Sequence, residues 1–286
     1  MEQIAIITDS CADVPEEWRE KYKIHVLPMV ITCQDGEYKD GVTIGAEDIY
    51  ERLKTELPKT STPTGEDMEK LFDELKGQGI EKVIAIMLSG GLSGTVNHMR
   101  LAAEEAGLET CIVDSKSASI GCGAIVLQTA IWAEDGMPYA ELCEGVKRLC
   151  ANTTVFFSID TLEYLQKGGR IGKATAIVGT ALSIKPILSF DEDGEIYTPA
   201  KVHGHKMVEK KLLSLVEEKI NDPTYQGKRY NIVVADGGAP EERDKLEDKM
   251  KKMFPDYQHL FCARIGAALS TYLGDGLLGA GVQFID

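Results

Sequence analysis

The stretch of this chain best suited to chemistry is LSGGLSGT at residues 88–95, which follows an apolar run at 82–87 and precedes a helix-like segment at 96–106. A strand, a glycine-rich loop and a helix start make an anion site, because the first helical amides lack partners and carry positive partial charge. The glycines let the backbone approach a ligand, while Ser89, Ser93 and Thr95 add hydroxyl donors. The alternative is a strand-to-helix turn that uses glycine and serine only for geometry and capping.

Two known loop motifs come close to this stretch without matching it. A phosphate-binding P-loop carries lysine before its last serine or threonine, whereas Gly94 stands directly before Thr95 here. A nucleophile elbow reads Gly-x-Ser-x-Gly, whereas GLSGT ends in threonine. The loop alone therefore predicts an anion site and leaves the anion open.

Composition excludes several classes of function. The length of 286 residues, 43% of them hydrophobic, suggests about two domains. The formal net charge of −15 disfavours a nucleic-acid partner. The first residues lack a basic segment followed by a long apolar one, and no run reaches the roughly 18 apolar residues of a spanning helix. We therefore expect a cytoplasmic protein without stable membrane insertion.

The sequence also carries no signature of a disulfide framework, a metal site or a dinucleotide cofactor. Its seven cysteines are scattered without a Cys-x-x-Cys pair, and no His-x-x-x-His occurs. The residues after the first predicted strand, TDSCAD at 8–13, contain no glycine, which excludes a dinucleotide-binding fingerprint. We expect neither a metal nor a cofactor.

Two patterns of predicted elements divide the chain. Up to about residue 150, strands at 4–8, 24–31, 82–87 and 110–114 alternate with helices from Pro15 and at 46–57, 65–76, 96–106 and 120–134. Such alternation is typical of a Rossmann-like parallel sheet covered on both faces. Later, strands at 187–190 and 196–202 flank an Asp193–Gly194 turn, which predicts an antiparallel hairpin. We expect an α/β protein with a parallel-sheet domain at 1–155, carrying the glycine-rich loop, and a mixed-sheet domain at 156–286.

Several motifs occur in one order along the chain. They are TDS at 8–10 with Asp13 and Pro15, TSTP at 60–63, LSGT at 92–95, YLQKGGRI at 164–171 and KPIL at 185–188. Together they resemble the DegV family of fatty-acid-binding proteins over essentially the whole chain. The resemblance implies a two-domain α/β fold that holds a long-chain fatty acid between or within its domains.

The resemblance also implies roles for particular residues. The carboxylate would be bound by the two hydroxyl-bearing loops, the helix start that follows the second loop, and Tyr272. Tyr272 stands where the family pattern has histidine. The residues expected to bind the carboxylate are Thr60, Ser61, Ser93, Gly94, Thr95 and Tyr272. Asp275, nearby, would repel an anion if it pointed inward. Arg170 would orient the head group or contact a partner, with a structural ion pair as the alternative.

Some members of the family present lipid to a bacterial fatty acid kinase, which phosphorylates the carboxyl group. By this resemblance we expect no catalysis in this chain itself. The alkyl tail needs an apolar tunnel, because each buried CH₂ contributes about 0.8 kcal/mol. Our candidates for that tunnel are Phe156, Phe157, Ile159, Leu162, Ile177, Ile184 and Phe261, although each could be ordinary core.

A different class of function remains open at this point. Ser93 could act as the nucleophile of a serine hydrolase on lipid esters or acyl phosphates, with His203, His205 or His259 as the base. The incomplete elbow motif and the tyrosine at the family's histidine position disfavour this alternative.

Overall fold

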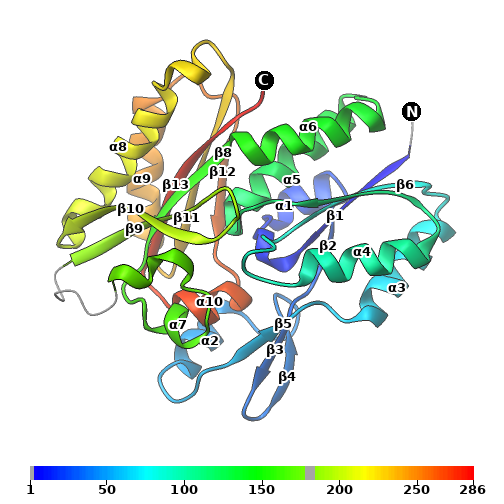
Figure 1. Ribbon diagram of the computed structural model, residues 1–286, viewed down its shortest axis with the longest axis horizontal. Helices are drawn as coiled ribbons and strands as arrows, with labels where there is room; N and C mark the ends of the chain where they lie inside the picture. The colour runs from blue at the N-terminus through cyan, green and yellow to red at the C-terminus, as the bar shows by residue number, and fades with distance from the viewer. Residues whose placement is uncertain (1–2, 178–183) are drawn as a thin grey trace.

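Two separate β-sheets organise the computed structural model, which describes residues 3–177 and 184–286 (Figure 1). The first sheet is entirely parallel, in the order β2 (His25–Leu27), β1 (Ile4–Asp9), β6 (Lys82–Met87) and β7 (Glu109–Asp114). Its two central strands are continuous apolar runs, as expected for strands buried on both faces. The predicted Rossmann-like N-terminal sheet is therefore confirmed.

The faces of this sheet pack against different helices. Ile7 and Ala85 belong to a core cluster with residues of α3 (Gly65–Gly77) and α4 (Thr95–Ala106). Ile6 and Ile84 point the other way, toward α5 (Ser119–Glu134) and α6 (Tyr139–Asn152), as the two-residue period of a strand requires. Helix α5 is apolar almost all round, because it also packs against the second sheet.

The second sheet is mixed and has six strands. Their order is β10 (Ile196–His203), β9 (Ile184–Phe190), β8 (Thr153–Ser158), β13 (Leu277–Phe284), β11 (Tyr230–Gly237) and β12 (Leu260–Arg264). All neighbours are antiparallel except β11 and β12. The predicted hairpin forms between β9 and β10, and the mixed C-terminal sheet is confirmed. Strand β8 contains residue 155, where we placed the domain boundary. The division into domains at 1–155 and 156–286 stays a prediction.

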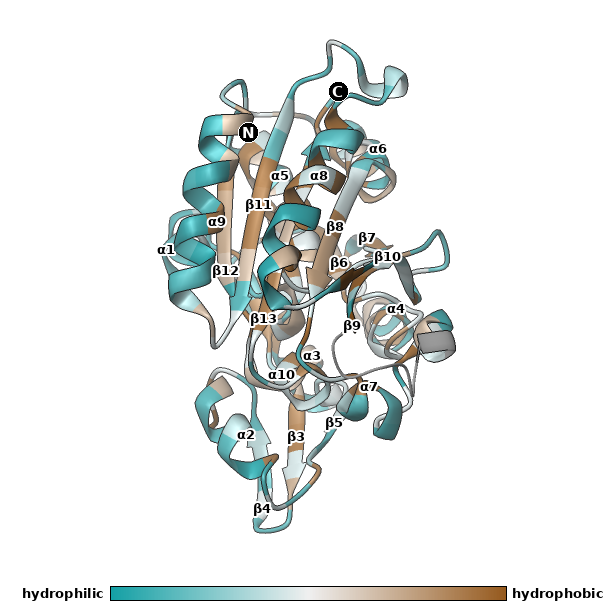
Figure 2. Cartoon of the chain, turned by 90° about the vertical axis from the view of Figure 1, so that its left-hand side faces the viewer, coloured by the Kyte–Doolittle hydropathy of each residue, from teal (hydrophilic) through white to brown (hydrophobic). Residues whose placement is uncertain are grey.

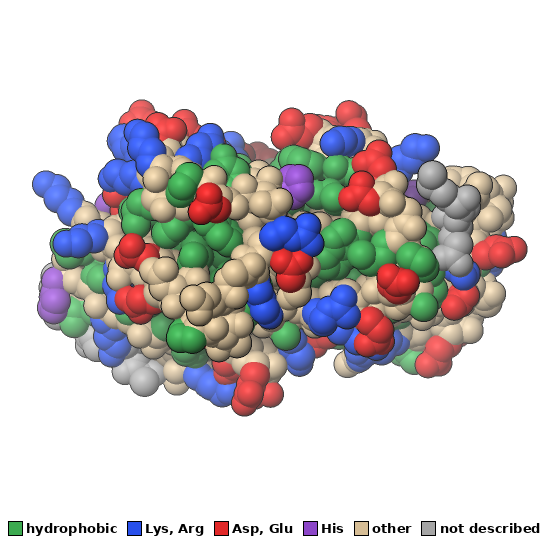
Figure 3. Space-filling model, turned by 90° about the horizontal axis from the view of Figure 1, so that it is seen from above, with side chains coloured by type: hydrophobic (Ala, Val, Ile, Leu, Met, Phe, Trp, Pro, Cys, Tyr) green, Lys and Arg blue, Asp and Glu red, His purple; other side chains and the backbone are tan. Residues whose placement is uncertain are grey.

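Helices α8 (Val208–Ile220) and α9 (Pro240–Met253) cover the outer face of the second sheet with their apolar sides (Figure 1). Much of β11 and β3 is hydrophobic, whereas α9 is mostly hydrophilic (Figure 2). Acidic and basic side chains intermix over the face seen from above (Figure 3). None of the helices within 3–177 and 184–286 is both long enough and apolar enough to cross a bilayer.

Short elements bridge the two sheets. Strands β4 (Gly36–Lys39), β3 (Val30–Cys33) and β5 (Lys59–Ser61) form a small antiparallel sheet below them (Figure 1). The remaining helices are α1 (Glu16–Lys21), α2 (Ala46–Arg52), α7 (Glu163–Lys167) and α10 (Ala267–Leu273). Thr64 caps α3 by accepting a hydrogen bond from the Asp67 amide, which confirms the predicted helix start.

Two local predictions were wrong, and one strand was not predicted. The strand predicted at 24–31 is two strands, because Pro28 interrupts the ladder and the chain turns into the small sheet. The helix predicted at 46–57 ends at Arg52, well before Pro58. The glycine-rich end contains β13, an interior strand: a side chain at Gly281 would lie 2.4 Å from the Thr154 carbonyl oxygen. Glycine there reflects close backbone packing.

Candidate ligand-binding site

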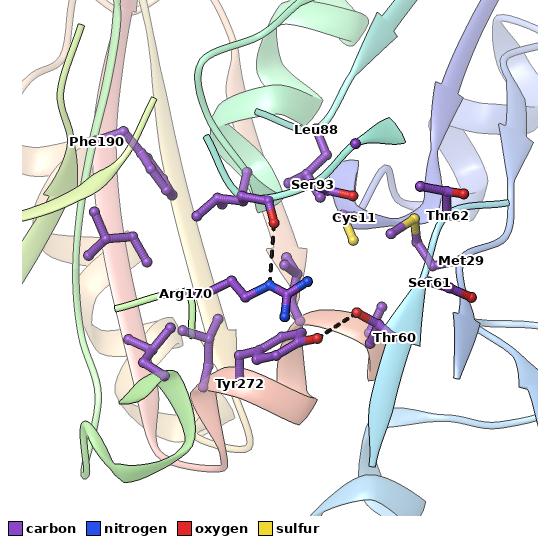
Figure 4. A pocket seen from close by; sticks show the side chains of 18 of the residues that line it. Cys11, Met29, Thr60, Ser61, Thr62, Leu88, Ser93, Arg170, Phe190 and Tyr272 are labelled. Carbon is purple, nitrogen blue, oxygen red and sulfur yellow. Dashed lines mark hydrogen bonds between the residues drawn. The ribbon is translucent and has the colours of Figure 1, made fainter. Parts of the chain in front are cut away.

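A cavity of about 260 Å³ lies between the two sheets, at the carboxyl ends of the parallel strands (Figure 4). This edge is where open α/β sheets bind ligands, because loops and helix starts converge there. One part of the lining carries polar groups, namely Thr60, Ser61, Thr62, Ser93 and Arg170 with the Tyr272 phenol. The rest is apolar or weakly polar: Cys11, Met29, Leu88, Leu92, Gly94, Ala118, Phe157, Leu165, Phe190, Ile196, Ala268, Leu269 and Leu273. The cavity thus has the polarity of an amphipathic ligand.

The polar part joins residues from distant segments. The Thr60 and Tyr272 hydroxyls lie 2.7 Å apart in a hydrogen bond, and the Arg170 guanidinium stands 5.0 Å from the centre of the Tyr272 ring (Figure 4). Arg170 donates to two carbonyl oxygens, those of Gly168 at 2.7 Å and Leu92 at 3.4 Å. It forms no salt bridge within the described part of the chain, so its charge is uncompensated at the cavity wall.

The glycine-rich loop contributes Ser93. Its hydroxyl lies 2.8 Å from that of Thr95 and also faces the Thr95 amide at 3.4 Å. Thr95 is fully buried, approaches the Met29 sulfur at 3.7 Å and does not line the cavity. Gly94 is the N-cap residue of α4 and provides no side-chain cap, while the amides of Asn97 and His98 donate to its carbonyl oxygen. Thr95 therefore contacts Ser93 from outside the cavity lining.

Strand alternation separates the three residues of the TSTP segment that line the cavity. Thr60 faces Tyr272, whereas the Ser61 hydroxyl points away from Arg170 (Figure 4). Thr62 lies two residues after Thr60, and its hydroxyl bonds the His98 ring at 3.0 Å. Thr62 was missed by the sequence analysis, although the two-residue period of a strand predicts that it shares a face with Thr60.

Three buried carboxyl groups lie beneath the site, where they hold the backbone in place. Asp9 accepts from the Leu88 and Cys11 amides. Asp13 accepts from the Gly266 amide and Asp40 from the Ala267 amide, at the start of α10. Burial raises the pKa of Asp9 to about 6 and of Asp13 to about 7, and it also raises the pKa of Asp40. The acidic residues of the TDS segment thus anchor the glycine-rich loop and the helix that carries Tyr272.

The described residues contain no cluster of histidine, cysteine, aspartate or glutamate suited to a metal ion. Asp275 is exposed and does not line the cavity, so the repulsion considered for it does not arise here. The polar end of the cavity therefore consists of the Arg170 guanidinium, the hydroxyls of the lining residues and the start of α4.

The hydrolase alternative lacks a base. Within the described residues, the Ser93 hydroxyl bonds Thr95 and no histidine. His203 and His205 are exposed at the end of β10, and His259 stacks on Phe261 with ring centres 5.8 Å apart. The geometry therefore disfavours Ser93 as a nucleophile.

Comparisons with known proteins agree with this geometry. A family model described as an uncharacterised protein of the DegV family matches residues 3–284. The chain belongs to the DegV family. A DegV domain-containing protein of Clostridium acetobutylicum is 39% identical over 280 residues, covering 98% of both chains.

Solved structures of DegV family proteins are also similar to this chain. A fatty-acid-binding DegV family protein from Thermus thermophilus superimposes with a TM-score of 0.91 at 27% identity, covering 99% of both chains. DegV from Bacillus subtilis, described as a fatty-acid-binding protein, gives a TM-score of 0.87 at 28% identity, covering 99% of this chain and 100% of that one. The two-domain DegV-like fold is therefore established.

The predicted tunnel residues separate into different places. Phe157 lines the main cavity and a second, smaller one of about 40 Å³, and Phe156 borders the smaller one. The structure does not bring Ile159, Leu162, Ile184 or Phe261 to either cavity; Phe261 packs edge-on against Trp18 instead. The side chain of Ile177 lies outside the described residues. Apolar residues that the sequence analysis missed, such as Phe190 and Leu269, line both cavities.

The tip of the β9–β10 hairpin closes against the glycine-rich loop. The Ser89 hydroxyl donates to the Gly194 carbonyl oxygen at 2.8 Å, and the Lys116 amine reaches the Asp193 carbonyl oxygen at 3.4 Å. A side chain on Gly91 would lie 2.8 Å from the Gly194 oxygen, which is closer than packed atoms approach. Gly91 therefore permits this closure.

Replacing Gly91 with alanine is expected to lower the free energy of unfolding by about 1–3 kcal/mol, because the new methyl group displaces backbone at the hairpin tip. Urea unfolding measures the change. Gly94→Ala is the matched control, because a methyl group there would meet nothing within 4 Å and its φ is −75°. Equal stabilities of the two variants would show that the hairpin contact contributes nothing.

Proposed function

We propose that this protein binds a long-chain fatty acid non-covalently, with the carboxylate at the polar end of the cavity and the tail along its apolar walls. The observation that carries the proposal is the Arg170 guanidinium, which has no carboxylate partner among the described residues and is set beside the Thr60, Ser93 and Tyr272 hydroxyls in an otherwise mostly apolar cavity. Similar DegV family structures described as fatty-acid-binding support the same ligand class.

The energetics favour a ligand with one charged end. A carboxylate that leaves water loses hydration worth several kcal/mol unless donors replace it. Arginine offers a fork of N–H donors that matches a carboxylate, and hydroxyls with a helix start supply further charge-assisted hydrogen bonds. The tail contributes about 0.8 kcal/mol for each buried CH₂ without any charged partner. The two ends of the cavity thus stabilise the two ends of one molecule.

The proposed carboxylate position also suits presentation to a second protein. A surface hollow of about 280 Å³ shares Thr60, Arg170 and Tyr272 with the main cavity, and Lys59 and Lys167 also line it. The residues proposed to bind the carboxylate therefore form a thin wall toward this hollow. We propose that a fatty acid kinase reaches the carboxyl group from this side and forms the acyl phosphate, with no catalytic residue in this chain.

Mass spectrometry tests fatty-acid binding. Protein purified from bacteria is expected to release one acyl chain per polypeptide on denaturation, and delipidated protein is expected to bind palmitate or oleate. Absence of a released acyl chain together with no binding of either acid would overturn the proposal. A second experiment combines the bacterium's own fatty acid kinase, ATP and the fatty-acid-loaded protein. Acyl phosphate that forms only when all three are present would support presentation to the kinase. No acyl phosphate in that mixture would refute presentation.

A further inference from the structure

The main cavity ends at a second cavity that is lined almost entirely by apolar groups. Five residues line both of them, namely Ala118, Phe157, Phe190, Leu269 and Leu273, so the two spaces adjoin. The smaller space measures about 40 Å³ against about 260 Å³ for the main cavity. A dry protein cavity of roughly 150 Å³ holds one benzene molecule, so the smaller space has room only for the last few atoms of a chain.

Two phenylalanine rings form much of the shared wall. Phe157 on β8 pairs with Leu188 on β9, and Phe190 follows Leu188 by two residues, which puts both rings on one face of the sheet. Their centres lie 5.7 Å apart at an interplanar angle of 33°, within the range of a favourable aromatic contact. Phe190 lies far from Thr62 across the cavity (Figure 4), at the apolar end.

The position of Phe190 is further constrained by its hairpin. The strand that carries it leads directly into the hairpin tip, where Gly194 accepts the Ser89 hydrogen bond from the glycine-rich loop. Asp191, next to Phe190, is bonded by the Lys173 amine and by the amides of Asp193 and Glu195. The backbone that carries Phe190 is thus held at the turn, so a longer tail that passes this point has to displace the ring itself.

We propose that Phe157 and Phe190 set the acyl-chain length that this protein accepts, as the gate between the main cavity and the smaller one. This inference rests on the proposed function, since it concerns the tail end of the same ligand. A chain that reaches the ring pair gains its last contacts there, and each further methylene has to displace Phe190. A shorter side chain at Phe190 joins the main cavity to the smaller one and admits a longer acyl chain.

Binding of saturated fatty acids of 10 to 20 carbons to delipidated protein tests the proposal. In the wild type, affinity is expected to rise about fourfold with each methylene and then stop rising at one chain length, which we call the turning point. In Phe190→Ala the turning point is expected to lie at least two carbons longer. Phe190→Leu keeps an apolar side chain that folds into the same core, and it is expected to shift the turning point in the same direction by less.

Phe254→Leu is the control, because Phe254 is the same residue type as the half-buried Phe190 but is buried in the other core cluster and lines neither cavity. It is expected to leave the turning point unchanged. If folded Phe190→Leu and Phe157→Leu keep the wild-type turning point, the gate is refuted while fatty-acid binding stands. If the wild type binds no chain of any length, the proposed function itself fails.

Discussion

Replacing Thr60 and Ser93 together with alanine is expected to weaken palmitate binding by about 10²- to 10⁴-fold. Each hydrogen bond to a charged group contributes roughly 1.5–3 kcal/mol, and tenfold in affinity corresponds to about 1.4 kcal/mol. Thr60 faces the Tyr272 hydroxyl, and Ser93 lies at the start of α4, so the substitutions remove two donors from the polar end. Isothermal titration of delipidated protein measures the loss.

Thr55→Ala combined with Ser214→Ala is the matched control for this double variant. Both residues are hydroxyl-bearing, and neither lines the cavity. The control is expected to bind palmitate as the wild type does, while Thr60→Ala and Ser93→Ala singly give intermediate losses. Unchanged affinity in the folded double variant would show that the carboxylate binds elsewhere, because the proposed polar end would have lost two of its hydroxyl donors.

Replacing Asp13 with asparagine is expected to make the protein increasingly stable relative to the wild type as the pH rises. Burial raises the pKa of Asp13 to about 7 from 3.8, so the folded protein holds this proton more tightly than the unfolded chain. The stability contributed by proton binding is therefore complete below pH 4 and is lost as the pH rises through about 7. Asparagine has no such titration.

Urea unfolding at a series of pH values measures this difference. The free energy of unfolding of Asp13→Asn minus that of the wild type is expected to increase by about 3 kcal/mol between pH 4.5 and pH 8. Asp275→Asn, which changes an exposed carboxylate, is the control and is expected to differ from the wild type by less than about 0.5 kcal/mol throughout. A pH-independent difference for Asp13→Asn would contradict a raised pKa.

Local patterns explain which elements were predictable. The alternation of apolar strands and amphipathic helices indicated the parallel sheet, and the Asp193–Gly194 turn indicated the β9–β10 hairpin. Thr64 marked the start of α3 because a hydroxyl at that position satisfies a free helical amide. Each of these signals resides in a few neighbouring residues, so it can be recognised without knowledge of the rest of the chain.

Elements that depend on distant neighbours were missed. Strand β13 contains Gly281 where the adjacent strand approaches too closely for a side chain, which no local propensity expresses. The tunnel candidates show the same limit. Phe157 and Phe261 are both apolar and buried, yet of the two it is Phe157 that lines the main and the smaller cavity. Hydrophobicity predicts that a side chain leaves water and says nothing about which interior space it borders.

The sequence by itself determined the family and the α/β class, because the motifs, their order along the chain and the alternation of strands and helices express both. Only the tertiary structure decided which of the candidate site residues meet. Thr60 and Tyr272, 212 residues apart, share a hydrogen bond, and Thr95 turns inward to hold Ser93. Arg170 lines the cavity and has no carboxylate partner in the part of the chain that the structure describes. The physical reason is that a binding site is a set of long-range distances, which depend on how whole sheets and helices pack.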